Sequence, residues 1–412
     1  MKPGMKEFDG AKIKELTDRH VMDTYRRLPL VAAWAEGSHI HDAGGRSYLD
    51  FISGLAVTAL GHCHPKVVEA IAAQAKVLGH VSNIYYTAPA AFLAERLASL
   101  SGLERVFFCN SGAEANEAAL KLARHFAWRK AGCPEGGQAP YVVVTAARSF
   151  HGRTYGALTA TGQTKYHAGF APLLPGVVHV PLNDLAALEA ALTPEVCAVL
   201  LEPVQGEGGV YPCSVEYLQG VRRLCDERGI LLMLDEIQTG LGRTGRMFAF
   251  EHFEIKPDVM TLAKALGGGL PLGAMLAREE VAAAFQPGDH ASTFGGNPIA
   301  CAAGLAVLEV LVDENLPARA AGLGRRLVGG LLALGRRNPL VGEVRGLGLM
   351  VGVDIDADAP LVAARCREAG LLVNAVGPHT LRFLPPLTVT PEEIDTAVSL
   401  VEQALRSSAG SA

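Results

Sequence analysis

The sequence lacks long apolar runs, paired cysteines and an excess of charge. Its longest apolar stretches, such as residues 230–234, are strand-sized and far too short to span a bilayer. The net charge is -5 with dispersed lysines and arginines, so no basic stripe for nucleic acid is present. The eight cysteines include no Cys-x-x-Cys pair, as expected of free thiols in a reducing compartment. These absences predict a cytoplasmic protein whose partner is a small molecule.

Two further features are expected to be absent. Residues 1–9 are charged and have no apolar core, so no secretory signal is predicted there. The cluster His62-Cys63-His64 offers two imidazoles and a thiol, but a metal site needs further ligands and no matching cluster occurs elsewhere. We interpret the cluster as a tight turn running into Pro65, and we expect no metal.

The chain is long enough for two or three domains of about 150 residues each. Short apolar runs alternate with amphipathic helices in its central part, and the runs are residues 105–109, 141–145, 197–201, 230–234 and 259–262. This alternation predicts an α/β fold, with a mostly parallel sheet flanked by helices on both faces. The clearest helix is expected at residues 214–228, where Gly229 stops it.

The two ends of the chain have a different texture. Residues 38–42 and 46–51 flank Gly44-Gly45 and predict a β-hairpin, and a helix is expected from Pro65 to residue 77. After about residue 300, Ala/Leu/Gly-rich helices are followed by apolar runs at 344–354, 371–373 and 381–384, then by a helix near Pro391. We expect a large domain at 65–300 and a smaller α+β domain at 301–412, to which the N-terminal segment 1–64 contributes.

The motif Asn110-Ser111-Gly112-Ala113-Glu114 directly follows one predicted strand and opens a helix. Ser111 and Glu114 have the spacing of a capping box. The free backbone N–H groups and the positive dipole end of such a helix form an anion site, and Gly112 lets a phosphate approach closely. An ordinary capped helix explains this motif, taken alone, better than an anion site does.

Two charged residues follow neighbouring strands. Asp235 ends the most hydrophobic strand, and a carboxylate buried there needs a cationic partner such as a protonated pyridine nitrogen. Lys264 comes two residues after the next strand, where desolvation would lower its pKa and make it a nucleophile. A turn-capping aspartate and a solvated lysine are the alternatives. A phosphate cup, a buried acid and a lysine, each at a strand end of one sheet, favour a site for pyridoxal phosphate.

A competing motif is Gly240-Leu241-Gly242-Arg243-Thr244-Gly245, which matches the dinucleotide pattern G-x-G-x-x-G. It does not follow its strand at once, and residues 247–253 are aromatic-rich with no clear helix start. The structural context that the dinucleotide motif requires is therefore missing.

Taken together, the motifs resemble the class III (ω-amino) aminotransferases of fold type I, and within that class the acetylornithine aminotransferases. The matching segments are Gly61-His62-Cys63-His64-Pro65, Asn110-Ser111-Gly112-Ala113-Glu114-Ala115-Asn116-Glu117, Phe150-His151-Gly152-Arg153, Glu202-Pro203-Val204-Gln205-Gly206-Glu207-Gly208-Gly209, Asp235-Glu236-Ile237-Gln238, Ala263-Lys264-Ala265-Leu266-Gly267-Gly268-Gly269 and Ser292-Thr293-Phe294-Gly295-Gly296-Asn297-Pro298. They occur in the family's order over nearly the whole chain.

The resemblance implies roles that spacing alone does not reveal. Phe150 would stack on one face of the pyridine ring of pyridoxal phosphate and Ile237 would pack on the other. Gln238 would hydrogen-bond the phenolic oxygen of the ring. Thr293 would reach the phosphate from a second subunit, with Ser292 beside it near the substrate. A homodimer with shared active sites is therefore expected.

The resemblance also implies a substrate site. Arg153 would hold the carboxylate distant from the reacting carbon, and Arg382 would hold the α-carboxylate of glutamate. Glu207 would pair with Arg382 when the substrate presents an ω-amine, and would swing aside for glutamate. From sequence alone, surface ion pairs explain both arginines better. Leu55 stands where ornithine aminotransferases carry a tyrosine that grips a free α-amine, so an acylated amine is favoured.

We therefore expect transamination between N2-acetyl-L-ornithine and 2-oxoglutarate, as in arginine biosynthesis. Succinyl-diaminopimelate, a carrier-linked aminoadipate derivative, ornithine and 4-aminobutyrate remain alternative substrates. Three other functions also remain open: a mutase or racemase with the same cofactor, a nicotinamide oxidoreductase, and a catalytically silent binding protein.

Overall fold

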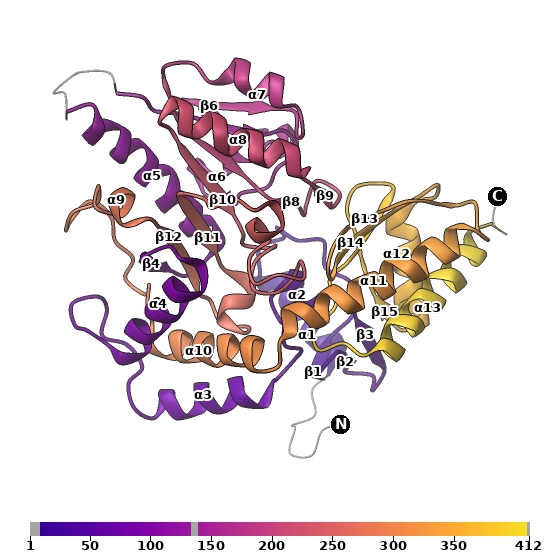
Figure 1. Cartoon of the computed structure of the whole chain (residues 1–412). Helices are drawn as coiled ribbons and strands as arrows, with labels where there is room; N and C mark the ends of the chain where they lie inside the picture. The colour runs from indigo at the N-terminus through magenta and orange to yellow at the C-terminus, as the bar shows by residue number, and fades with distance from the viewer. Residues whose placement is uncertain (1–8, 133–138, 410–412) are drawn as a thin grey trace.

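The computed structural model describes residues 9–132 and 139–409. At its centre lies a seven-stranded sheet with the order β4-β12-β11-β10-β7-β5-β6 (Figure 1). The strands are β4 (Arg105–Cys109), β5 (Val142–Ala146), β6 (Val177–Val180), β7 (Val196–Leu201), β10 (Leu231–Asp235), β11 (Val259–Leu262) and β12 (Gly273–Ala277). Only β12 runs against its neighbours, so the prediction of a mostly parallel sheet is confirmed.

The five predicted apolar runs all form strands of this sheet, within one residue at their ends. Two further strands of this sheet, β6 and β12, were not predicted. The edge strand β6 is only half covered, so its exposed positions break up the apolar run, and β12 has the sequence Gly-Ala-Met-Leu-Ala, whose residues also suit a helix.

Helices cover both faces of the large sheet, because successive side chains of each buried strand point in opposite directions. Leu231 and Met233 face the cluster that includes α5, whereas Leu232 and Leu234 face the cluster that includes α8. The helices of this part are α3 (Pro65–Ala75), α4 (Ala88–Ser101), α5 (Gly112–Lys130), α6 (Tyr155–Ala160), α7 (Leu185–Ala191), α8 (Val215–Arg228), α9 (Glu279–Ala282) and α10 (Pro298–Asp313), with the 3-10 turns η1 (Thr164–Tyr166), η2 (Ala249–Phe253) and η3 (Lys264–Gly267).

Helix α8 shows how its sequence fixes both of its ends. The Ser214 side chain accepts a hydrogen bond from the Tyr217 N–H at the start. Gly229, with φ of 63°, adopts the left-handed conformation that terminates the helix. The predicted bounds of this helix are confirmed, and α3 starts at Pro65 as predicted but ends at Ala75.

The C-terminal part contains a second sheet with the order β13-β14-β17-β16. Its elements are α11 (Leu316–Gly335), β13 (Val341–Leu347), β14 (Met350–Ile355), α12 (Ala359–Ala369), β15 (Leu371–Leu372), β16 (Asn374–Ala375), β17 (Thr380–Phe383) and α13 (Pro391–Ala409). The predicted N-terminal hairpin is present, and β15 extends its sheet to the order β1-β2-β3-β15. The N-terminal elements are α1 (Gly10–His20), β1 (Ala32–Glu36), β2 (His39–Asp42), β3 (Ser47–Asp50) and α2 (Ser53–Ala56).

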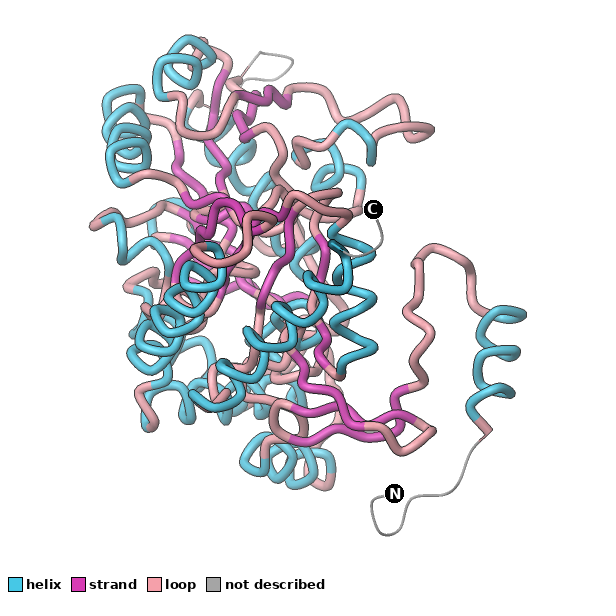
Figure 2. The backbone as a smooth tube through the Cα atoms, turned by 90° about the vertical axis from the view of Figure 1, so that its right-hand side faces the viewer, coloured by secondary structure: helices cyan, strands magenta, loops and turns pink. Residues whose placement is uncertain are grey.

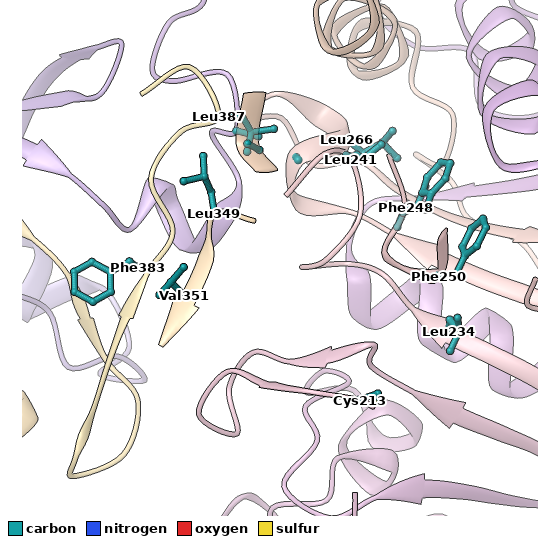
Figure 3. Packing of buried hydrophobic residues seen from close by; sticks show 14 of the residues in the cluster. Cys213, Leu234, Leu241, Phe248, Phe250, Leu266, Leu349, Val351, Phe383 and Leu387 are labelled. Atoms are coloured by element: carbon teal, nitrogen blue, oxygen red, sulfur yellow. The ribbon is translucent and has the colours of Figure 1, made fainter. Parts of the chain in front are cut away.

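A continuous apolar cluster joins the two sheets (Figure 3). It runs from Leu234 and Phe248 beside the large sheet to Val351 and Phe383 in the smaller one. The two sheets therefore share one packed core. Helix α1 has no buried residue and stands away from this body (Figure 2). In the described part of the chain, no helix is long and apolar enough to cross a membrane.

Candidate active site

A cavity of about 480 Å³ opens at the carboxyl ends of β4, β5, β7, β10 and β11. Loops that follow parallel strands meet at this edge, which is where open α/β sheets bind ligands. The lining includes Ser111, Gly112, Ala113, Phe150, Arg153, Glu207, Asp235, Ile237, Gln238 and Lys264. Ten residues singled out from the sequence thus surround one space.

The start of α5 forms one end of the cavity. Ser111 caps the helix, because its hydroxyl accepts a hydrogen bond from the Glu114 N–H at 3.2 Å. The second bond of the predicted capping box is different, since the Glu114 carboxylate accepts from the Asn110 N–H, at 2.6 Å, rather than from Ser111. The first N–H groups of a helix have no partner within it, so this end attracts an anion.

Gly112 is required at this helix start for a packing reason. A Cβ atom on Gly112 would lie 2.7 Å from Ile237 Cδ1, so no larger residue fits without moving Ile237. The backbone of the anion site and an apolar wall of the cavity are thereby in direct contact.

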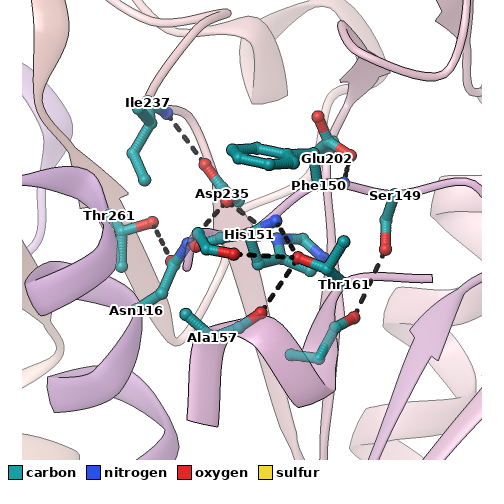
Figure 4. A network of polar contacts seen from close by, with 12 residues as sticks. Asn116, Ser149, Phe150, His151, Ala157, Thr161, Glu202, Asp235, Ile237 and Thr261 are labelled. Atoms are coloured by element: carbon teal, nitrogen blue, oxygen red, sulfur yellow. Dashed lines mark hydrogen bonds and ion pairs between the residues drawn. The ribbon is translucent and has the colours of Figure 1, made fainter. Parts of the chain in front are cut away.

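Asp235 lines the cavity but is only 4% exposed. Its polar contacts are drawn in Figure 4. Its Oδ2 accepts from Asn116 Nδ2 at 2.8 Å and contacts His151 Nδ1 at 2.8 Å. Its Oδ1 accepts from the Ile237 N–H at 3.1 Å. Asn116 is itself oriented by Thr261, whose hydroxyl donates to the Asn116 amide oxygen at 2.8 Å. These contacts fix the carboxylate in one orientation.

The buried acids and bases of the site influence one another. Burial alone lowers the pKa of His151, but the hydrogen bond and charge of Asp235 outweigh it, so this pKa is raised. Burial raises the pKa of Glu202 to about 7, although the neighbouring His151 opposes the shift. One Glu202 oxygen accepts from the Phe150 N–H at 2.9 Å, which ties this carboxyl to the cavity wall.

Lys264 is the first residue of η3, two residues after the end of β11. Its φ of 44° is unusual for a residue other than glycine and is typical of strain held at functional sites. Burial lowers the pKa of its amine, although the charge of Glu207 opposes this shift. A buried amine of this kind has a larger neutral, nucleophilic fraction than a solvated lysine.

These residues fit pyridoxal phosphate. At the anion end, a side chain at position 112 would clash with Ile237, so glycine keeps the helix backbone bare for a phosphate. At the other end, Asp235 can face a protonated ring nitrogen. In Figure 4 the Asp235 carboxylate lies between Ile237 and Phe150, which can cover two faces of a planar ring. Among the described residues, no group of three or more His, Cys, Asp or Glu side chains is arranged to hold a metal ion.

The sequence of residues 21–405 matches the family model of class-III aminotransferases. The chain belongs to the class III aminotransferases. It is therefore a transaminase that depends on pyridoxal phosphate, with the fold-type I architecture of that class.

Individual relatives of this aminotransferase agree with the family match. It is 50% identical over 388 residues to an acetylornithine aminotransferase from Caldanaerobacter subterraneus, covering 94% of this chain and 97% of the relative. It is 52% identical over 392 residues to one from Gloeobacter violaceus, covering 95% and 96%.

Solved structures show the same architecture. The ornithine aminotransferase of Toxoplasma gondii has a TM-score of 0.94 at 34% identity, covering 99% of this chain and 98% of the other. The acetylornithine aminotransferase of Elizabethkingia anophelis has a TM-score of 0.86 at 33% identity, covering 97% and 100%. A further structure of the Toxoplasma enzyme contains pyridoxal phosphate at partial occupancy in its active site.

Four of the residues expected to bind the cofactor or the substrate, or to select the substrate, do not line the main cavity of this aminotransferase. Leu55, in α2, is 43% exposed. Ser292 and Thr293 line a second cavity of about 330 Å³, although Asn110, which borders both cavities, donates to Ser292 Oγ at 3.2 Å. Arg382 is fully buried behind Glu207. Its NH1 lies 2.6 Å from Glu207 Oε1 and 3.0 Å from the Gly206 carbonyl oxygen, and its NH2 donates to Asn374 at 2.8 Å.

The Arg382–Glu207 pair changes the pKa of the carboxyl group. Burial alone raises the pKa of Glu207, but the charges of Arg382 and Lys264 and the hydrogen bonds from Arg382 and Gln238 together outweigh it, so this pKa lies below its usual value. The Arg382 Nε is buried and has no hydrogen-bond partner. Arg153, in contrast, is exposed, and its guanidinium lies over the ring of Tyr166, 3.9 Å from the centroid.

Sequence reasoning missed several polar residues of the aminotransferase site. His151 and Asn116 stand inside motifs that it quoted, but neither received a role. A fully buried asparagine on an otherwise apolar helix face is the one signal that points to Asn116, because buried amides need partners. The motif at residues 240–245 forms turns that lead to the short 3-10 segment η2 and not to an α-helix, so the strand–turn–helix context of a dinucleotide site is not formed there.

Proposed function

We propose that this enzyme transfers the ω-amino group of N2-acetyl-L-ornithine to 2-oxoglutarate, as a step of arginine biosynthesis. The buried Arg382 covered by Glu207 carries this proposal, because it allows one site to accept two unlike substrates. Relatives about 50% identical bear the name acetylornithine aminotransferase. Leu55 supports an acylated amine, since it has no hydroxyl to hold a free α-amine. A lysine-pathway amine such as succinyl-diaminopimelate is the second candidate, since it presents the same ω-amine.

We propose that Lys264, Asp235 and the α5 start act together on the cofactor. When bound, pyridoxal phosphate supplies an aldehyde that bonds amines and a ring that accepts electrons. The N–H groups at Ser111, Gly112 and Ala113 would hold its phosphate. The Asp235 carboxylate, oriented by His151 and Asn116, would keep the ring nitrogen protonated. The Lys264 amine, with its lowered pKa, would carry a proton to and from the reacting carbon.

Glu207 and Arg382 would sort the substrates. An ω-amine arrives with no carboxylate beside the reacting carbon, so the Arg382 charge needs another partner, and Glu207 provides it at 2.6 Å. Glutamate brings an α-carboxylate that replaces Glu207 on the guanidinium. Arg153 would bind the distal carboxylate, Gln238 would bond the phenolic oxygen, and Phe150 and Ile237 would cover the ring.

We also propose a homodimer in which Thr293 reaches the phosphate of the partner's site, with Ser292 beside the substrate. Exposed apolar side chains beside this loop support the proposal: Tyr85 is 69% exposed, Phe92 58% and Phe294 58%. The segments that carry Tyr85 and Phe294 are joined, because Asn83 donates to the Ser292 and Gly295 carbonyl oxygens. Mixing inactive Lys264→Ala subunits with Thr293→Val subunits should restore activity through one complete site per dimer.

We propose domain boundaries at residues 64/65 and 300/301. Helix α10 runs across the second of these boundaries and packs against α3 and α4. We also propose a cytoplasmic location. Seven free cysteines in the described residues support it, because unpaired thiols suit a reducing compartment.

The test is a panel of amino donors with 2-oxoglutarate. N-acetylornithine should react with a kcat/KM at least about tenfold above those of ornithine, 4-aminobutyrate and succinyl-diaminopimelate, a margin of about 1.4 kcal/mol. A higher kcat/KM for succinyl-diaminopimelate would move the enzyme to the lysine pathway. Borohydride should attach the cofactor to the wild-type protein and not to Lys264→Ala. Full transamination by that variant would disprove the role of the lysine.

A further inference from the structure

The loop that carries Glu207 connects two short strands, β8 (Val204–Gln205) and β9 (Tyr211–Pro212). Its last residue, Val210, is fully buried and has φ of 58°. A β-branched residue rarely adopts a positive φ, and such strain persists only where the surroundings enforce it. The loop is therefore held in place by specific contacts.

The large-domain side of the loop is held by hydrogen bonding and by close packing. The Gly206 N–H donates to Glu202 Oε1 at 3.3 Å. A Cβ atom on Gly208 would lie 2.8 Å from the Arg148 carbonyl oxygen, so the loop backbone packs directly on this segment.

The other side of the loop is held by Arg345 of β13. Its Nε donates to the Gly209 carbonyl oxygen at 2.9 Å. Its NH1 and NH2 bond the two oxygens of Asp354 at 2.7 and 2.8 Å, which fixes the plane of the guanidinium. The same group lies over the ring of Tyr211, 4.0 Å from the centroid, while Arg148 lies on this ring at 4.6 Å.

The register of the small sheet relates this contact to the substrate arginine. Arg345 of β13 is paired with Gly352 of β14, and Gly352 is paired with Arg382 of β17. Residues directly opposite each other share a face of a sheet, so the three form one row. The loop lies along this row: Arg345 bonds Gly209, Val210 covers Gly352, and Arg382 bonds Glu207.

Gly352 leaves the space that the loop occupies. A Cβ atom on Gly352 would lie 2.9 Å from Val210 Cβ, so even an alanine would push the loop away from the sheet. Arg345, Gly352 and Arg382, one from each of three neighbouring strands, thus form the surface against which the loop packs.

We propose that Arg345 is a positioning residue for substrate selection, which holds the loop backbone over Gly352 so that only the Glu207 side chain moves between the two half-reactions. This inference rests on the proposed exchange between Glu207 and the glutamate carboxylate. Release of the loop leaves Arg382 uncovered more often. The ω-amine substrate then meets an unpaired buried charge, whereas glutamate supplies its own carboxylate and is little affected.

The test compares four variants of the full-length holoenzyme with the wild type. Arg345→Lys keeps the charge beside Asp354 but loses the planar two-point geometry, and Gly352→Ala displaces the loop by an independent route. Glu207→Gln is the reference for an Arg382 whose charge is not neutralised, because glutamine keeps the side chain but loses the negative charge. Arg326→Lys is the matched control, because Arg326 makes a similar two-point pair with Asp395 on the small domain but does not contact the loop.

The measured quantity is the ratio of kcat/KM for glutamate to kcat/KM for N-acetylornithine, each from the absorbance change of the bound cofactor in single-turnover mixing. We expect Arg345→Lys and Gly352→Ala to raise this ratio about tenfold, in the direction of Glu207→Gln, as loss of a charge-assisted contact predicts. Arg326→Lys should leave it unchanged, and all variants should retain the wild-type cofactor spectrum.

Three results would overturn the inference. If Glu207→Gln raises the ratio but neither Arg345→Lys nor Gly352→Ala does, the switch works without this clamp. If both half-reactions slow equally in Arg345→Lys, the residue has only a structural role. If Glu207→Gln itself leaves the ratio unchanged, the proposed exchange fails, and the inference fails with it.

Discussion

Replacing Arg382 by alanine should separate the two half-reactions. The arginine is fully buried, and its NH1 and NH2 groups bond Glu207, the Gly206 carbonyl oxygen and Asn374. In the proposed mechanism its guanidinium exchanges Glu207 for the α-carboxylate of glutamate. Arg382→Ala removes the guanidinium that would bind the α-carboxylate of glutamate. N-acetylornithine has no carboxylate beside its ω-amine and therefore does not depend on this guanidinium.

The magnitude follows from the burial of this contact. Loss of one partner from a buried, hydrogen-bonded charge pair costs about 2–5 kcal/mol. Since 1.4 kcal/mol is a factor of ten, kcat/KM for glutamate should fall by about 30-fold to several thousandfold. The single variant also leaves Glu207 unpaired beside the substrate, so the double variant Arg382→Gln/Glu207→Gln is the cleaner comparison. For N-acetylornithine the double variant should lose less than about tenfold.

Single-turnover mixing with each amino donor measures the two half-reactions separately. Thermal unfolding and the cofactor spectrum serve as controls, because both should show a folded, loaded enzyme. Equal losses in kcat/KM for the two donors would refute the assignment of Arg382 to the α-carboxylate. A loss confined to N-acetylornithine would refute it more strongly.

Three further predictions concern the cofactor end of the site. Asp235→Asn removes the buried charge that would face the ring nitrogen. Since breaking a buried ion pair costs about 3–5 kcal/mol, kcat in both half-reactions should fall about a hundredfold or more. A loss in only one half-reaction would contradict this role. Gly112→Ala should weaken cofactor binding about tenfold in an absorbance titration, because the new methyl group would be too close to Ile237 in the cavity wall. Gly329→Ala is the control and should not weaken binding, because the space around Gly329 is open. Burial raises the pKa of Glu202 from 4.5 to about 7. Between these pH values the folded protein therefore holds a proton that the unfolded chain releases. The stability that this group contributes is fully present below pH 4.5 and is lost as the pH rises through about 7. The Tm of Glu202→Gln should therefore decline less than that of the wild type between about pH 4.5 and pH 8, and parallel curves would show that Glu202 does not titrate in this range.

Local features of this chain were predictable because their causes lie within a few residues. The Ser111 cap of α5, the bounds of α8 and the five apolar strands follow from backbone hydrogen bonding and from side-chain periodicity. The position of Lys264 and Asp235 at strand ends also followed, because parallel strands bring their carboxyl ends to one edge.

The tertiary structure decided which charged groups meet wherever the family resemblance gave no expectation. The resemblance led us to expect the Arg382–Glu207 pair, but the two residues are 175 positions apart, and nothing in their local sequence points from one to the other. His151 finds Asp235 across 84 residues, and nothing in its neighbourhood along the chain marks it as a partner. The row of Arg345, Gly352 and Arg382 exists only through the register of three strands. Chain-local energies do not specify such pairings, because they arise from the packing of the whole core.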